Sequence, residues 1–116
     1  MMGKIQVKRI YEPATKSDGF RVLVDRLWPR GISKSNVILD LWIPEIGPST
    51  TLRTWFRHDS DRWSEFQRRY HAELKKNIEL VAELKGHAKK GTLTLLYSAK
   101  DEVHNQAIAL RSFLLR

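Results

Sequence analysis

Apolar residues along this chain follow two spacings, one typical of strands and one typical of helices. Over residues 5–10 they alternate with basic and polar residues, which predicts a strand with one wet face, suited to a sheet edge. Residues 20–24 and 92–97 are nearly continuous in apolar character, which predicts two inner strands. Residues 37–43, which end before a proline, predict a shorter fourth strand.

Apolar residues three or four positions apart predict the helices. One such run forms a buried stripe that Asn77 or Gly86 can divide, made of Trp63, Phe66, Tyr70, Leu74, Ile78, Val81 and Leu84. Ser49 is a suitable N-cap for a short helix over 50–56. A last helix is expected to turn four residues toward the core: Val103, Ala107, Leu110 and Leu114.

The order of these elements predicts an α/β fold, a single compact domain over residues 1–116 with a small, mostly parallel sheet and flanking helices. In such sheets, ligands bind outside the carboxyl ends of the strands, where loops meet helix N-termini. The segments that follow the two inner strands are residues 25–31 and 98–105. If those strands are parallel neighbours, both segments open into one cleft.

Composition narrows the range of functions. The 116 residues suit one domain, and 21 basic against 13 acidic residues give a net charge of +8, which favours anionic partners. The chain has no cysteine, which excludes disulfides, thiolate nucleophiles and Cys-ligated zinc. It also has no apolar run near the roughly 18 residues of a spanning helix, so we expect a cytoplasmic protein without membrane contact.

The segment after the first inner strand combines a carboxylate, two guanidinium groups and an indole. Arg26 and Arg30 are expected to hold an anion, because arginine binds oxyanions through paired hydrogen bonds. Asp25 is expected to orient an arginine or act as a general base, and Trp28 to contact the ligand. The structural alternative is an Asp–Arg pair that closes the loop, with Trp28 packed as a lid.

The segment after the second inner strand carries a further set of polar residues. His104 is expected to transfer protons and Lys100 to stabilise negative charge, with Asp101 and Asn105 as further ligand contacts. In the structural alternative, Asp101 or Glu102 caps the last helix and His104 is a solvated first-turn residue.

A third group lies before the long helical run. His58 with Asp59 and Asp61 resembles half of a metal site, but the sequence offers no obvious further ligands. We therefore predict no metal site here, a capping role for Asp59, and a position for His58 overhanging the cleft as a ligand contact.

Two long segments, VLVDRLWPRG over 22–31 and AKDEVHN over 99–105, resemble the YeaO-like branch of the domain-of-unknown-function 488 family. The resemblance runs from about Val7 to Leu114. It implies a compact cytoplasmic α/β domain and marks both segments as typical of the branch, but the family has no established activity to carry over. Other branches carry cysteines near the last strand, and their absence here speaks against a thiol mechanism in this chain.

The leading hypothesis is a cleft that binds an anionic, phosphate- or nucleotide-like small molecule, with Asp25 and His104 available for acid–base catalysis. The alternative is a nucleic-acid-binding module that uses the basic surface and exposed tryptophans. A third hypothesis is a structural or regulatory subunit with an apolar patch beside Trp42 or Trp55. The motifs do not identify a substrate, a cofactor or an oligomeric state, and they do not decide between an enzyme and a binding protein.

Overall fold

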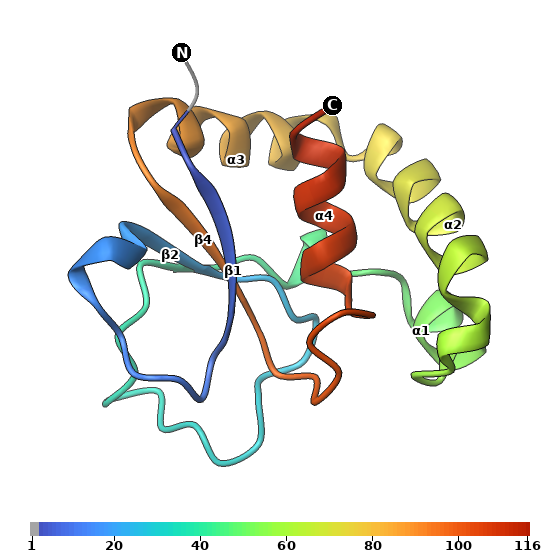
Figure 1. Ribbon diagram of the computed structural model, residues 1–116, viewed down its shortest axis with the longest axis horizontal. Coiled ribbons are helices and arrows are strands. Elements are labelled where there is room, and N and C mark those ends of the chain that lie inside the picture. The colour runs from blue at the N-terminus through green and yellow to red at the C-terminus, as the bar shows by residue number, and fades with distance from the viewer. Residues whose placement is uncertain (1–2) are drawn as a thin grey trace.

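The computed structural model describes residues 3–116, in which one sheet contains β1 (Ile5–Arg9), β2 (Phe20–Leu23), β3 (Leu41–Trp42) and β4 (Leu93–Tyr97) (Figure 1). The strand order is β1-β4-β2-β3, and every neighbouring pair is parallel. The α/β class, the edge position of the first strand and the inner positions of the two apolar strands are thus confirmed.

Four helices gather on one side of the sheet: α1 (Thr50–Phe56), α2 (Trp63–Lys76), α3 (Ile78–Lys90) and α4 (Gln106–Leu114) (Figure 1). Helix α4 packs directly on β1 and β4, and α2 packs on α4 and α1. Short 3₁₀ turns occur at Lys16–Asp18, Pro44–Ile46 and Ser60–Arg62. Within the described residues, no helix is long and apolar enough to cross a membrane.

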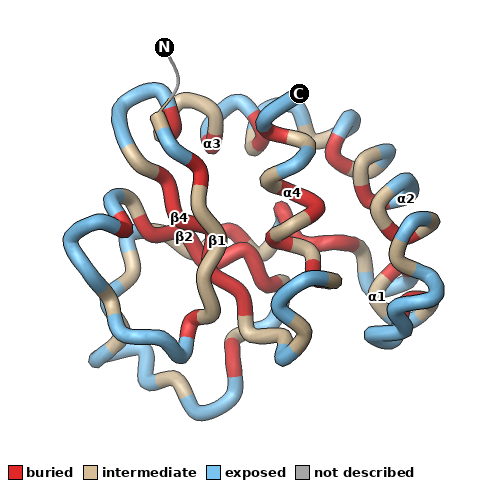
Figure 2. The backbone as a smooth tube through the Cα atoms, in the orientation of Figure 1, coloured by how far each residue is buried: buried red, intermediate tan, exposed pale blue. Residues whose placement is uncertain are grey.

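The two faces of the sheet are buried by different partners. Because successive side chains of a strand point to opposite faces, Val22 and Leu95 join the main core beneath the helices, whereas Leu23 and Leu96 join a smaller core. Trp28, Ile32, Val37, Leu39 and Trp42 pack on that smaller core. Figure 2 shows the inner strands buried along their length and the long loops exposed. A loop therefore covers the face that has no helix.

The third strand is shorter than predicted, since only Leu41–Trp42 of the expected 37–43 pairs with β2. A side chain ends the ladder. The Asp40 carboxylate accepts a hydrogen bond from the Arg21 backbone N–H at 2.8 Å, so that N–H is not free for a strand carbonyl. Residues 37 and 39 instead pack on the smaller core.

The long helical run divides at Asn77, one of the two predicted positions. Asn77 leaves helical geometry at φ −101° and ψ 54°, and its side chain donates to the Glu45 carbonyl at 3.1 Å. The break changes the rotation of the second half, so Ile78 is 72% exposed and its predicted place in the core stripe is wrong.

The last helix begins later than the sequence suggested. Asn105 caps it, because its side chain accepts a hydrogen bond from Ile108 N–H at 3.0 Å. Val103 lies before the cap and is 62% exposed, so its predicted core position is wrong. The side chain of Asp101 caps the preceding turn instead, accepting from the backbone N–H groups of Val103 and His104 at 2.9 Å each.

Candidate functional site

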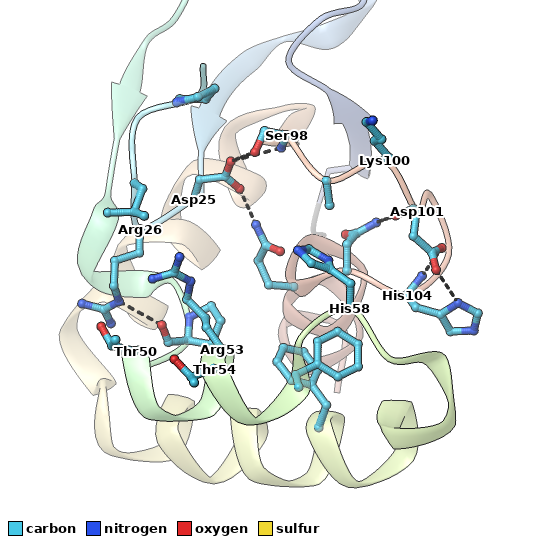
Figure 3. A pocket seen from close by; sticks show the side chains of 18 of the residues that line it. Asp25, Arg26, Thr50, Arg53, Thr54, His58, Ser98, Lys100, Asp101 and His104 are labelled. Atoms are coloured by element: carbon cyan, nitrogen blue, oxygen red, sulfur yellow. Dashed lines mark hydrogen bonds and ion pairs between the residues drawn. The ribbon is translucent and has the colours of Figure 1, made fainter. Parts of the chain in front are cut away.

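A pocket of about 990 Å³ lies where β2 and β4 end, bordered by the segments that follow both strands and by α1 (Figure 3). It is lined by all nine residues expected at the site: Asp25, Arg26, Trp28, Arg30, His58, Lys100, Asp101, His104 and Asn105. The expectation that the two strand-end segments share one cleft is therefore confirmed. The chemical roles assigned to these residues remain predictions.

Hydrogen bonds between the two strand-end segments form one wall of the pocket. The Ser98 backbone N–H donates to Asp25 Oδ2 at 3.1 Å, and the Ser98 hydroxyl donates to the same oxygen. Arg9 of β1 holds the second segment from behind, since its guanidinium donates to the carbonyls of Ala99 at 2.9 Å and Ser98 at 3.1 Å. The wall thus depends on three adjacent strands.

Helix α1 supplies the opposite wall. Its N-cap is Ser49, as predicted, and Ser49 is itself tied to α2 because its N–H and hydroxyl donate to Glu73 at 2.9 Å and 2.6 Å. This anchor places Thr50, Arg53 and Thr54 along the pocket.

These three residues of α1 were not among the predicted site residues. Their spacing of three and four puts them on one polar helix face, and that periodicity was the available signal. Gln106 and the supporting role of Ser98 were not predicted either, because a serine after a strand suggested only a nucleophile that lacked its flanking glycines.

Asp25 is a buried carboxylate, 7% exposed, in the wall of the pocket. It accepts hydrogen bonds from Ser98 on one oxygen and from the Gln106 side chain on the other. Burial raises the pKa of Asp25, while the hydrogen bonds from Ser98 and Gln106 and the positive charge of Arg53 oppose that rise. Within residues 3–116 no cation forms an ion pair with Asp25, so the loop-closing Asp–Arg pair of the structural alternative is wrong, and no ion pair supports the predicted arginine-orienting role.

Arg26 has a structural task in addition to lining the pocket. Its Nε donates to the Pro48 carbonyl and its Nη2 to the Gly47 carbonyl, both at 2.8 Å. The contact is close, since a Cβ added at Gly47 would lie 3.0 Å from the Arg26 backbone nitrogen. Arg26 therefore clamps the start of α1 to the end of β2, which leaves it fewer donors for an anion than the sequence analysis assumed.

Three other cations along the pocket differ from Arg26. Among the residues that the structure describes, no side-chain hydrogen bond or ion pair engages Arg30, Arg53 or Lys100. They come from three separate segments of the chain: the loop after β2, helix α1 and the loop after β4. Their charge is thus available to a bound group.

Two of the predicted ligand contacts have polar groups already engaged within the fold. The indole Nε1 of Trp28 donates to the Ile32 carbonyl at 2.8 Å, and its ring packs edge-on against Trp42 at 5.2 Å. Asn105 is 2% exposed, and its amide nitrogen donates to the Asp101 carbonyl at 2.9 Å while its oxygen caps α4. Trp28 thus packs much as the structural alternative described, and Asn105 contributes to stability.

Asp101 and His104 form a hydrogen-bonded pair at the other end of the pocket. His104 Nδ1 lies 2.9 Å from Asp101 Oδ2, and the imidazole packs edge-on against Trp63 at 5.4 Å. The backbone N–H groups of His104 and Val103, with the imidazole, lower the pKa of Asp101 to about 2. Asp25 and the Asp101–His104 pair line the same pocket from different segments, and each has its own hydrogen-bonding partners.

His58 reaches the pocket from an unusual turn. Arg57 and His58 both have positive φ, 48° and 56°, a region that non-glycine residues adopt rarely. Asp59 then caps the next turn by accepting from Asp61 N–H at 3.0 Å, which confirms its predicted capping role. The turn brings the exposed His58 beside Phe56 at the pocket. Residues in such rarely adopted backbone conformations are found most often at functional sites.

The chain matches a known protein family over almost its whole length. Residues 4–116 match a family model described as the inactive DUF488-N3 subclade. The chain belongs to this subclade. The DUF488 resemblance noted in the two strand-end segments is therefore confirmed over almost the whole chain.

The DUF488-N3 chain is also similar to individual proteins over most of their length. It is 49% identical over 110 residues to the uncharacterized protein YeaO of Escherichia coli K12, covering 95% of this chain and 96% of YeaO. It is 35% identical over 111 residues to the uncharacterized protein Rv3073c of Mycobacterium tuberculosis H37Rv, covering 96% of this chain and 93% of the relative. No solved structure is a significant match to this chain.

Proposed function

We propose that this protein binds an anionic small molecule, with a phosphate- or nucleotide-like group, in the pocket at the ends of β2 and β4. One observation carries the proposal: Arg30, Arg53 and Lys100 come from three segments, border one pocket, and have no side-chain partner among the described residues. Guanidinium groups suit phosphate because two parallel hydrogen bonds fix its orientation. The proposed compartment is the cytoplasm, which suits a chain without cysteine.

The proposal is one of binding without turnover. Among the described residues, no hydrogen bond or ion pair links Asp25 to the Asp101–His104 pair, so the fold does not couple these groups for a joint acid–base mechanism. The description of the subclade as inactive favours the same choice.

The tryptophans do not favour the alternative of a nucleic-acid-binding module. All four tryptophans are half-buried rather than exposed. Trp28 and Trp42 pack on each other with Lys34 Nζ over both rings, and Arg62 and Arg69 lie over Trp55 at 5.2 Å and 4.2 Å. Since base stacking needs open aromatic faces, only the net charge of +8 supports this alternative.

The test is isothermal titration calorimetry with inorganic phosphate, sugar phosphates and nucleoside monophosphates. We expect the double substitution R30A/R53A to weaken binding by about 100-fold, because each charge-assisted hydrogen bond contributes about 1.5 kcal/mol or more. Arg26 is left intact because it holds the start of α1. The matched control is K89A/K90A, which removes two cations from the exposed end of α3, a helix with no residue in the pocket lining. Equal affinities in wild type and double variant for every anion that binds would refute the site.

A further inference from the structure

Asp25 is out of place in a pocket that only binds anions. A buried carboxylate in the wall repels a phosphate group, and it is 7% exposed, so solvent screens it little. The fold nonetheless holds it there with three hydrogen bonds, from the Ser98 N–H, the Ser98 hydroxyl and the Gln106 amide. A purely structural carboxylate in this protein is treated differently: Asp18 is paired with the cations Lys8 and Arg21.

The hydrogen bonds of Asp25 leave acceptor capacity on one oxygen. An ionised carboxylate has about four lone-pair sites, two on each oxygen. Both sites of Oδ2 are used by Ser98, whereas Oδ1 accepts only from Gln106. Since Asp25 lines the pocket, the second site of Oδ1 is available to a hydrogen-bond donor there.

The volume of the pocket also indicates a ligand larger than a simple anion. At about 990 Å³ it is at the upper end of the range for drug-sized ligands, about 300–1,000 Å³, and far exceeds what a bare phosphate fills. Phe56, Phe66 and Pro48 supply apolar surface between the charged groups. A ligand that fills this pocket has further groups beyond its anionic group. Asp25 is placed to contact one of those groups.

We propose that Asp25 is the specificity-determining residue of the pocket: its Oδ1 accepts a hydrogen bond from a hydroxyl or amino group of a phosphate ester whose phosphate lies on Arg30 and Arg53. The ligand class is then a hydroxyl- or amine-bearing phosphate ester, such as a sugar phosphate or a nucleotide, and not a simple inorganic anion. This inference rests on the proposed function and deepens it. Ser98 and Gln106 are positioning residues, since they orient the carboxylate.

The test compares two phosphate esters of equal charge and similar length on the wild-type protein. Ribose 5-phosphate carries hydroxyl groups, and n-pentyl phosphate carries none. We expect calorimetry to show ribose 5-phosphate binding about tenfold tighter or more, the range for a hydrogen bond to a charged group. Equal affinities would overturn the inference and leave the proposed function standing, whereas binding of neither ester would overturn both. This comparison needs no variant.

A pair of isosteric variants then assigns the preference to Asp25. D25N is expected to lose most of the preference for ribose 5-phosphate, because the amide has one acceptor oxygen, which Ser98 occupies. The affinity of D25N for n-pentyl phosphate is expected to equal or exceed that of the wild type. E79Q removes the same charge from the exposed start of α3, outside the pocket, and is expected to keep the preference. A D25N protein that folds, by circular dichroism, and keeps the wild-type preference would overturn the assignment.

Discussion

Two buried aspartates show how differently one residue type is used in this fold. Asp18 is 3% exposed and sits between Lys8, at 3.2 Å, and Arg21. Burial alone would raise its pKa, but hydrogen bonds from Thr15, Lys8 and Arg21 outweigh that effect and lower the pKa of Asp18 to about 2. Asp25 is similarly buried but has no ion-pair partner in the described part of the chain, and burial raises its pKa. The first is held in an ion-pair network, and the second lines the pocket.

Removing the charge of Asp18 should destabilise the protein strongly. D18N leaves Lys8 and Arg21 without their counter-charge, and breaking a buried pair in this way costs about 3–5 kcal/mol. The measurement is urea unfolding at pH 7. The control is E65Q on α2, where the pairs with Arg68 and Arg69 are largely exposed and contribute about 0–1 kcal/mol. Equal losses in the two variants would contradict this assignment.

The lowered pKa of Asp18 also predicts a pH dependence. Its folded-state pKa lies below the ordinary 3.8, so the stabilisation is fully present above that value and is lost as the pH falls from 3.8 toward about 2. Wild-type unfolding free energy should therefore decline over this window, and D18N should lack that component of the decline. The same slope in both proteins would count against the ion-paired state of Asp18.

The helices that border the pocket are set in place by their N-caps. Ser49 caps α1 and is held by Glu73 of α2, while Asn105 caps α4 and is held by the Asp101 carbonyl. Each cap thus joins a helix start to a segment that lines the pocket or supports it. The polar residues at these positions specify both the helix boundary and the shape of the site.

Loss of the α4 cap should be measurable. N105A removes the acceptor for Ile108 N–H and the donor to Asp101, and cap removal costs about 1–2 kcal/mol. N105D keeps the acceptor oxygen and should retain more of the stability than N105A. Chemical denaturation of the three proteins checks the order, and a stability of N105A equal to wild type would show that the cap contributes nothing.

The whole molecule has two cores on the faces of one parallel sheet and a basic surface with a net charge of +8. This charge produces a long-range field that favours polyanions in general, whereas the small-molecule site proposed for the pocket would select its ligand by geometry. The two modes of binding differ in their dependence on salt, because contacts with a nucleic acid release many counterions and contacts with one small ligand release few.

Ligand binding should therefore stabilise the whole fold with little dependence on salt. A phosphate ester at 100 times its Kd is expected to add about 2.7 kcal/mol to the unfolding free energy. Thermal denaturation at 50 and 200 mM salt measures the shift, with single-stranded DNA as the comparison polyanion. A shift produced only by DNA, and lost steeply as salt rises, would favour the nucleic-acid-binding alternative.

The location of the site could be predicted because it follows from local patterns. Continuous apolar runs identify the inner strands, and the polar segments after them must leave a parallel sheet at the same edge. The hydrogen-bonding partners of the site residues could not be predicted in this way. Asp25 and Ser98 are 73 positions apart, and Ser49 and Glu73 are 24 apart, so no local periodicity encodes these contacts.

The amino-acid pattern alone was enough to specify the α/β class, the inner strands, the cap of α1 and the two segments that line the pocket, because each depends on the spacing of apolar and capping residues. Tertiary packing decided the environment of each residue in the site. It engaged Arg26 with the carbonyls before α1 and brought Arg53 to the pocket. It also buried Asp25 without an ion-pair partner among residues 3–116. The reason is physical. The charge state and free hydrogen-bonding capacity of a side chain are set by its neighbours in space, and those neighbours come from distant parts of the chain.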